Sequence, residues 1–227
     1  MLEGLFEVLI PNWNRAGDRL WTATSATLEM VAIAGLISFV LGTTFGVLLV
    51  VTKKGGILEQ SVVYNILDKI INVIRAIPFL ILLVLLIPVS RAIMGTGMGV
   101  TGMIIPLVVG TTPFFARQIE SAIAELDPGL VEASLAMGMS PLEIIFSVYL
   151  RESISSITRV TQITGINLVA LTTFAGVVGG GGLGDFAIQF GHELRLRDLL
   201  WTAIIILLII VSVIQLIGNI VIKVTTR

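Results

Sequence analysis

The sequence predicts an all-α integral membrane protein that crosses the bilayer with about five helices. Hydrophobic residues make up 56% of the 227 residues and charged residues only 13%, against about 45–50% and about 25% in soluble domains. The mean hydropathy is +1.03. Four stretches without Asp, Glu, Lys or Arg are 23 to 25 residues long, and a helix needs about 20 apolar residues to cross the hydrocarbon. We therefore expect a single transmembrane domain over residues 1–227.

The expected spans follow from these stretches and their flanks. The charge-free stretches are Met30–Thr52, Ala92–Ala116, Val160–Gly184 and Leu199–Ile222. With helical flanks added, the predicted transmembrane helices lie at about 22–52, 62–90, 97–120, 143–178 and 199–223.

The second of these spans has the weakest signal. Its apolar part, Ala76–Ser90, has only 15 residues and contains two prolines, so it crosses the membrane only if Val62–Arg75 forms a more polar lower half. Asp68, Asn72 and Arg75 share one helical face, as expected of a half-exposed helix. We expect Arg75 to extend its charged end to the membrane interface.

The basic residues predict the orientation. Nine Lys or Arg residues lie in one set of flanks and five in the other. The nine are Lys53, Lys54, Lys69, Arg75, Arg117, Arg151, Arg159, Lys223 and Arg227. Flanks rich in Lys and Arg face the cytoplasm. Because five spans place the two termini on opposite sides, we expect the N-terminus outside and the C-terminus inside.

The composition also excludes several functions. The chain has no cysteine and one histidine, His192, so it lacks the side chains for a disulfide, a thiolate metal site or a histidine cluster. A net charge of −1 provides no basic surface for nucleic acid. We expect no catalytic residue, no metal site and no cofactor in this chain.

A short helix is predicted in the polar segment between the third and fourth spans. Asp127 and Pro128 form a typical helix start, and Gly138 can close the helix in a left-handed turn, which gives a helix at about 128–138. Ser140 and Glu143 then form a capping-box pattern that starts a second helix leading into the fourth span.

The short helix is too short to be stable by itself in water, so it needs a surface to pack on. It presents Glu132, Ala133 and Ser134, and no basic residue occurs from Ala122 to Leu150. A helix lying on the lipid surface usually carries Lys or Arg. A groove in a partner protein therefore suits this helix better than an anionic membrane, although both remain open.

The same segment resembles the "EAA" loop of bacterial ABC-importer permeases. The matching positions are Glu132, Ala133, Ser134, Gly138, Val148 and Leu150, with the spacing of that loop intact. Ser134 and Val148 are conservative departures, and Arg151 stands where the loop has proline. Four further runs resemble the permeases of methionine ABC importers: Arg75–Phe79, Ile81–Leu83, Pro113–Arg117 and Gly179–Gly184.

This resemblance implies a type I importer permease in a bacterial cell membrane. Two copies of the chain would form the pathway, two cytoplasmic ABC ATPase subunits would bind ATP-Mg and drive transport, and an extracytoplasmic binding lipoprotein would deliver an amino acid, expected to be methionine. The short helix would be the coupling helix that contacts the ATPase. The implied contact residues are Glu132, Ala133, Ser134, Met137 and Gly138.

The fourth span carries small and polar residues at three- and four-residue steps. Thr161, Asn167 and Thr172 are candidates for lining a polar path. The alternative is that small residues there let helices pack closely. Both interpretations remain open, although Asn167 is too polar to face lipid.

The glycine run matches a nucleotide-binding motif only in part. Gly179, Gly181 and Gly184 match G-x-G-x-x-G, but no strand precedes them and no P-loop lysine follows, so we expect a flexible outer turn and no nucleotide site.

A self-contained channel or carrier, or a permease for another small solute, is the alternative function. A proton-coupled carrier is disfavoured because the four charge-free stretches hold no ionisable group.

Overall fold

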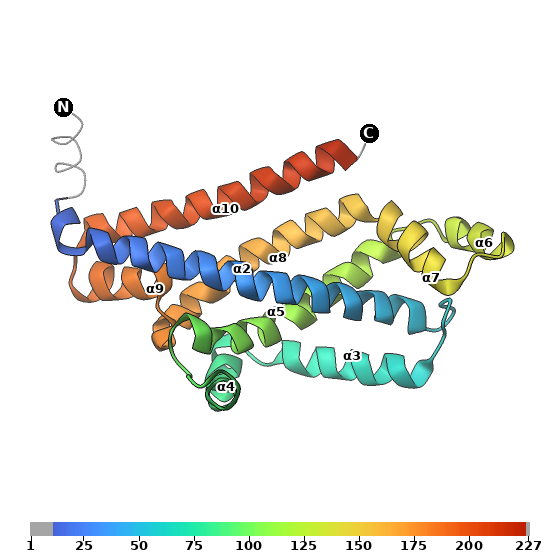
Figure 1. Cartoon of the computed structure of the whole chain (residues 1–227), viewed down its shortest axis with the longest axis horizontal. Helices are drawn as coiled ribbons and strands as arrows, with labels where there is room; N and C mark the ends of the chain where they lie inside the picture. Colours follow the sequence, from blue (N-terminus) through green and yellow to red (C-terminus); the bar gives the residue numbers. More distant parts are fainter. Residues whose placement is uncertain (1–10, 226–227) are drawn as a thin grey trace. The chain divides into compact units, whose positions relative to one another are not determined.

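The computed structural model describes residues 11–225, so the counted Arg227 lies outside the described residues. The described chain is helical, with no β-strand (Figure 1). The α-helices are α2 (Trp13–Thr52), α3 (Ser61–Ala76), α4 (Phe79–Met94), α5 (Gly99–Ala124), α6 (Pro128–Ala136), α7 (Pro141–Ile144), α8 (Ile154–Ala175), α9 (Gly182–Phe186) and α10 (Arg197–Thr225). Three π-helical segments are η1 (Ile145–Leu150), η2 (Gly176–Gly180) and η3 (Ala187–Glu193).

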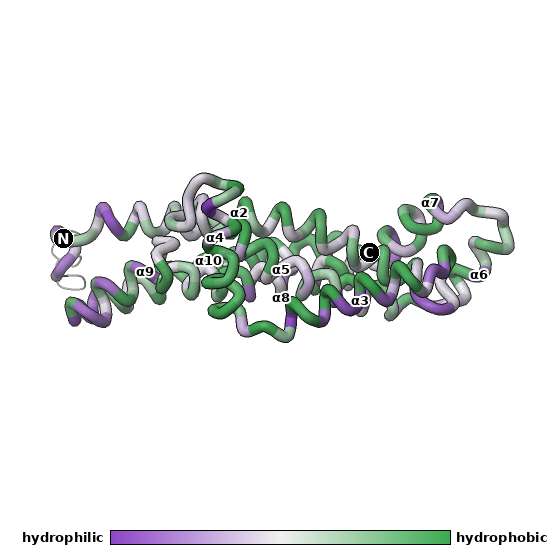
Figure 2. The backbone as a smooth tube through the Cα atoms, turned by 90° about the horizontal axis from the view of Figure 1, so that it is seen from below, coloured by the Kyte–Doolittle hydropathy of each residue, from purple (hydrophilic) through white to green (hydrophobic). Residues whose placement is uncertain are grey.

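The long helices account for the predicted spans. Four stretches are long and apolar enough to cross a membrane, and a fifth crossing results if α3 and α4 count as one. Figure 2 shows apolar residues along the long helices and hydrophilic residues mainly near helix ends and connections. These observations confirm the predicted all-α membrane class with about five spans.

Two expected spans are interrupted in the structure. The helix expected at 62–90 is broken at Ile77 and Pro78, where Ile77 is extended, with φ −81° and ψ 124°, because a residue before proline avoids the α conformation. The helix expected at 143–178 starts earlier, at Pro141, has a turn at Ser153, and ends in the glycine-rich η2.

The described chain forms two compact units. The first takes in the chain up to Gly35, Pro78–Val108 and Gly165–Ile214, and the second takes in Leu36–Ile77, Val109–Thr164 and the chain from Gln215. Four of the five points at which the chain passes between them lie inside helices α2, α5, α8 and α10. Each unit has two buried clusters of its own.

The clusters combine residues from several helices. In the first unit, fully buried residues include Met30, Leu83, Met103, Leu107 and Leu168. In the second unit they include Phe115, Ile119, Ile123 and Ile144. Many other large apolar side chains are exposed on the long helices, as expected where the surrounding solvent is lipid.

Helices α2 and α5 pack closely in the second unit because α2 carries glycine at the contact. A Cβ atom on Gly42 would lie 2.6 Å from Cδ1 of Phe115. One on Gly46 would lie 2.6 Å from Cβ of Ile119 and 2.7 Å from the carbonyl oxygen of Ala116. Glycines four residues apart allow this approach, which gives the helix pair dispersion contacts that lipid cannot replace.

A polar contact joins α8 to α10 in the same unit. Nε2 of Gln162 donates to the backbone oxygen of Gln215 at 2.6 Å and to Oδ1 of Asn219 at 3.2 Å. A Cβ atom on Gly218 would lie 2.5 Å from Cδ of Gln162. The glycine thus leaves room for an amide that needs partners in an apolar environment.

We expect Gly46→Ala to destabilise the full chain by about 1–3 kcal/mol, because the added methyl group meets backbone and β-carbon atoms that cannot rotate away. Gly35→Ala is the matched control, since its Cβ would meet only Cδ2 of Leu168, at 3.3 Å, at the rotatable end of that side chain. Thermal unfolding of the purified chain in detergent measures both. Equal unfolding temperatures for the two variants would contradict the packing argument.

Candidate functional site

Helix α6 has the two ends that its sequence predicts. The Asp127 side chain accepts a hydrogen bond from the Gly129 backbone nitrogen at 2.8 Å, and Pro128 is the first helical residue. At the other end Gly138 has φ +79°. Its nitrogen donates to the Leu135 oxygen at 3.0 Å, and the Met139 nitrogen donates to the Ser134 oxygen at 3.1 Å. This pair of bonds is a Schellman cap.

The following helix begins with the predicted capping box. The Ser140 nitrogen donates to Oε2 of Glu143 at 2.7 Å, and the Glu143 nitrogen donates to Oγ of Ser140 at 3.4 Å. Hydrogen bonds from the Ser140 backbone and side chain hold the pKa of Glu143 below its usual value. Two capped helices are therefore joined by a short connection with few free backbone groups.

The chain continues from α7 through η1 toward α8. Ile144, Val148 and Tyr149 are buried there and belong to the same cluster as Ile123 of α5. Arg151, which replaces the proline of the resembling loop, has helical backbone angles of φ −70° and ψ −48°. The bend comes two positions later, at the buried Ser153.

The residues predicted to contact an ATPase do not all face outward. Glu132, Ala133 and Gly138 are exposed, and Met137 is 73% exposed. Ser134, which the sequence analysis expected to be presented, is only 5% exposed, and its Oγ donates to the Leu130 oxygen at 2.7 Å. The expectation for Ser134 was wrong because this position lies on the packed face of the helix, where a small hydroxyl can close on the preceding turn.

Several large apolar side chains of this segment are exposed. They are Leu130, Leu135, Met137, Leu142 and Phe146, each at least 44% exposed. Sequence reasoning missed Leu142 and Phe146, although their four-residue spacing on one helix was a usable signal. Leu130, Leu135 and Met137 lie outside the expected spans, where exposed apolar residues are typical of a protein–protein contact.

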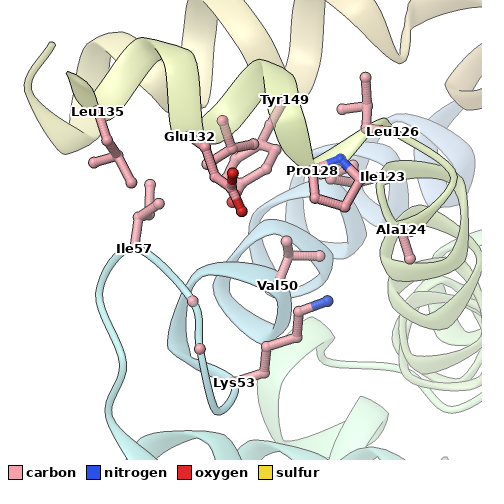
Figure 3. A pocket seen from close by; sticks show the side chains of 13 residues that line it. Val50, Lys53, Ile57, Ile123, Ala124, Leu126, Pro128, Glu132, Leu135 and Tyr149 are labelled. Carbon is pink, nitrogen blue, oxygen red and sulfur yellow. The ribbon is translucent and has the colours of Figure 1, made fainter. Parts of the chain in front are cut away.

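A cavity of about 280 Å³ lies beneath α6 within the second unit. Figure 3 shows the Glu132 carboxylate directed into this cavity, with Val50 and Lys53 at the end of α2 on another wall. Neither charged group is in an ion pair within the described part of the chain. Helix α6 therefore packs on the buried cluster through Val131 and leaves a hollow beside Glu132.

A charged cluster ties α3 to α5. Arg117 pairs with Asp68, and its Nη2 donates to Oδ1 of Asn72 at 3.1 Å while Nη1 donates to Oε2 of Glu120 at 2.7 Å. The sequence placed Asp68 and Asn72 on one face together with Arg75, which is exposed. It did not identify Arg117 as their partner, because that pairing depends on how the helices pack.

The candidate pathway residues fall in different environments. Oγ1 of Thr161 donates to the Ile157 oxygen at 2.7 Å. Thr172 is 1% exposed, and its Oγ1 donates to the Val169 oxygen at 2.7 Å. The half-buried Asn167 side chain makes no hydrogen bond among the described residues. Of the three, Asn167 has the amide with capacity left for water or a solute.

The glycine run forms a turn between η2 and α9, and no strand precedes it in the described chain. Gly179, Gly181 and Gly182 have φ values of +90°, +73° and +84°. The Leu183 nitrogen donates to Oγ1 of Thr27 at 2.8 Å, and a Cβ atom on Gly182 would lie 2.7 Å from that oxygen. The turn is therefore closely packed instead of loose. Among the described residues, no group of three His, Cys, Asp or Glu could hold a metal ion.

An all-helical chain with several apolar spans and a capped helix outside them is typical of a multi-pass membrane protein. The chain belongs to the family described as binding-protein-dependent transport system inner membrane component, which matches residues 42–227. This confirms the importer-permease resemblance.

Individual relatives agree with this assignment. The chain is 46% identical over 202 residues to a probable D-methionine transport system permease protein of Vibrio cholerae, covering 89% of this chain and 90% of that protein. It is 37% identical over 217 residues to a methionine import system permease protein of Bacillus subtilis, covering 96% and 97%. A solved inward-facing MetNI methionine ABC transporter matches with a TM-score of 0.91 and 38% identity, covering 94% of this chain and 99% of that chain.

We expect Gly138→Val to open the Schellman cap, because a β-branched residue resists positive φ at a cost of about 1–3 kcal/mol. No atom lies within 4 Å of a Cβ built on Gly138, so crowding does not contribute. Gly138→Asn is the matched control, since Asn tolerates this conformation. Hydrogen exchange at the Met139 amide should become faster in the Val variant and change little in the Asn variant. Unchanged protection in both would refute the strain argument.

Proposed function

We propose that this chain is the permease subunit of an ATP-driven methionine importer. The observation that carries the proposal is the match over nearly the whole chain to methionine permeases at 37–46% identity. Two copies of the chain form the pathway, since five helices enclose little space and a symmetric dimer closes it. An extracytoplasmic binding lipoprotein supplies the amino acid.

In this proposal, ATP hydrolysis takes place in two separate ABC ATPase subunits. The glycine run of this chain lacks the Lys-Ser/Thr ending of a P-loop, so ATP-Mg binds to the partner and this chain is not an enzyme. The solved MetNI methionine ABC transporter, which the chain matches closely, supports such an ATPase partner.

Helix α6 is the element that transmits ATPase movement to the spans. Its caps at Asp127 and Gly138 hold it together as one unit, and the capping box at Ser140 joins it to the helix that leads into α8. Ala133, Met137 and Gly138 provide its accessible side, the exposed Glu132 is directed toward the cavity beneath the helix, and the buried Ser134 fixes the packed face. The exposed apolar residues around them provide the contact area.

The proposed orientation places this segment in the cytoplasm and the N-terminus outside, following the nine-to-five bias in basic residues. The chain has no cysteine, so single-cysteine variants report accessibility without background. Lys53→Cys and Ser140→Cys should react with a membrane-impermeant thiol reagent only in inside-out vesicles. Glu193→Cys should react only from the outside. Labelling of Ser140→Cys in intact cells would reverse the orientation.

The importer proposal is tested by reconstituting the chain in vesicles with the ATPase and binding protein of a methionine system. We expect methionine uptake that requires ATP, the ATPase and the binding protein together. In the proposal the permease forms the pathway, the ATPase supplies the energy and the binding protein supplies the substrate. Uptake at the same rate by the chain alone would instead support a channel or carrier. Uptake of another amino acid in place of methionine would correct the substrate.

A variant of the coupling helix sharpens this experiment. Ala133→Trp places a large side chain on the accessible side of α6, and overpacking a fitted contact by about 1–3 kcal/mol weakens binding about 5- to 150-fold. The variant should insert normally but lose ATPase association or ATP-driven uptake. Ala92→Trp, at an exposed position in α4, should keep both.

A further inference from the structure

A second cavity, of about 360 Å³, lies in the first unit and belongs to no part of the coupling segment. Its walls come from the start of α2, the start of α5, the glycine turn, α9 and η3. Two of its lining residues are charged, Arg19 and Asp185, and Gln189 adds an amide. The volume falls within the range of about 300–1,000 Å³ typical of small-molecule pockets.

Aromatic side chains hold the positive group at this cavity. Cζ of Arg19 lies 5.5 Å from the centre of the Phe190 ring, and Phe190 stacks on Phe186 with ring centres 4.7 Å apart. Both rings are at least 93% buried. The contact with the Phe190 face positions the guanidinium while leaving its N–H groups free to donate.

The closely packed glycine turn positions the negative group. Thr27 Oγ1 accepts from the Leu183 nitrogen, and the same oxygen would collide with any side chain at Gly182. Asp185 follows two residues later on α9. A Cβ atom on Gly181 would meet no atom within 4 Å, so this part of the turn faces open space. Thr27 thereby fixes where α9 starts and where Asp185 lies.

Arg19 and Asp185 form no ion pair with any described residue. The cavity is lined by one positive and one negative side chain. A ligand with one negative and one positive group would therefore pair with both of them. The remaining walls are apolar or small, including Ala23, Val100 and the two phenylalanines. A polyanion or a simple cation would leave one of these two charges without a partner, so the lining favours a zwitterion.

We propose that this cavity binds a zwitterionic apolar α-amino acid, with its carboxylate at Arg19, its ammonium group at Asp185 and its side chain against the phenylalanine rings. The inference rests on the proposed function, which supplies an amino acid to this chain. A guanidinium and a carboxylate form the strong, charge-assisted hydrogen bonds that this ligand requires. A thioether side chain gains an additional sulfur–aromatic contact.

The cavity is a receiving site in this scheme. Arg19 lies near the N-terminal end of α2, whereas Lys53 follows its C-terminal end. In the proposed orientation the Arg19 end is extracytoplasmic, on the side where the binding protein releases its amino acid. The site then holds the amino acid before it enters the spans.

Equilibrium binding of radiolabelled methionine to the permease–ATPase assembly in lipid nanodiscs, without binding protein, tests the site. We expect saturable binding that weakens about 10- to 100-fold in Arg19→Ala and in Asp185→Asn, because each variant removes a charge-assisted partner. Arg91→Ala, at an exposed basic residue outside the cavity, is the matched control and should bind as the parent does.

A ligand series separates binding from a structural role. N-acetylmethionine has no ammonium group, so Asp185→Asn should leave its binding unchanged, whereas Arg19→Ala should still weaken it. Equal loss of both ligands in Asp185→Asn would mean that Asp185 only supports the fold, which would overturn the assignment.

The same preparations distinguish the two proposals. If the parental assembly takes up methionine with binding protein but binds none in nanodiscs, or if the two variants bind as the parent does, the cavity is not the site and the proposed function stands. If the folded parental assembly neither binds nor transports methionine, the proposed function and this inference both fail.

Discussion

The close contact between α2 and α5 is the constraint on which the second unit depends. Lipid offers no hydrophobic force to bring two apolar helices together, so contact area and close approach must do so. Gly42 and Gly46 allow that approach. It aligns Val50 of α2 with Ile123 of α5 in one buried cluster, which Ile144 also joins. The two glycines thus help to form the buried cluster on which α6 packs.

The segment outside the spans is stabilised in a different way. Its helices are short, so neither apolar burial nor propensity alone would maintain them. Side chains and backbone groups at the ends of α6 and α7 satisfy the hydrogen-bonding groups that short helices leave open. The result is a pair of capped short helices attached to spans that are stabilised by packing.

Local features of this segment could be predicted from the sequence because they depend on neighbouring residues. Asp127, Gly138 and Ser140 act within one or two turns, and all three occupy the roles their types indicate. The resemblance to a family motif added the expected contact residues, which no local rule provides. The fold class followed from the lengths of the charge-free stretches, since the bilayer sets those lengths directly.

Features that depend on distant residues could not be predicted. Two of these features need a neighbour far away in the sequence: the pairing of Arg117 with Asp68 and the tight packing of Gly182 against Thr27. The burial of Ser134 depends on how α6 is oriented on the helices beneath it. The break at Ile77 was only partly foreseen, because proline both interrupts helices and occurs within them, as Pro88 does in α4.

The cavity beneath α6 has a consequence for the proposed coupling role, because the side chains that line it limit how far this helix can move. In the proposed coupling role, the distance that α6 can move toward the spans depends on the size of residues such as Val50 and Ala124, which line the far walls of this cavity. Larger residues there would shorten the stroke without touching the ATPase contact. In this role the movement of α6 is limited by residues other than those that contact the ATPase.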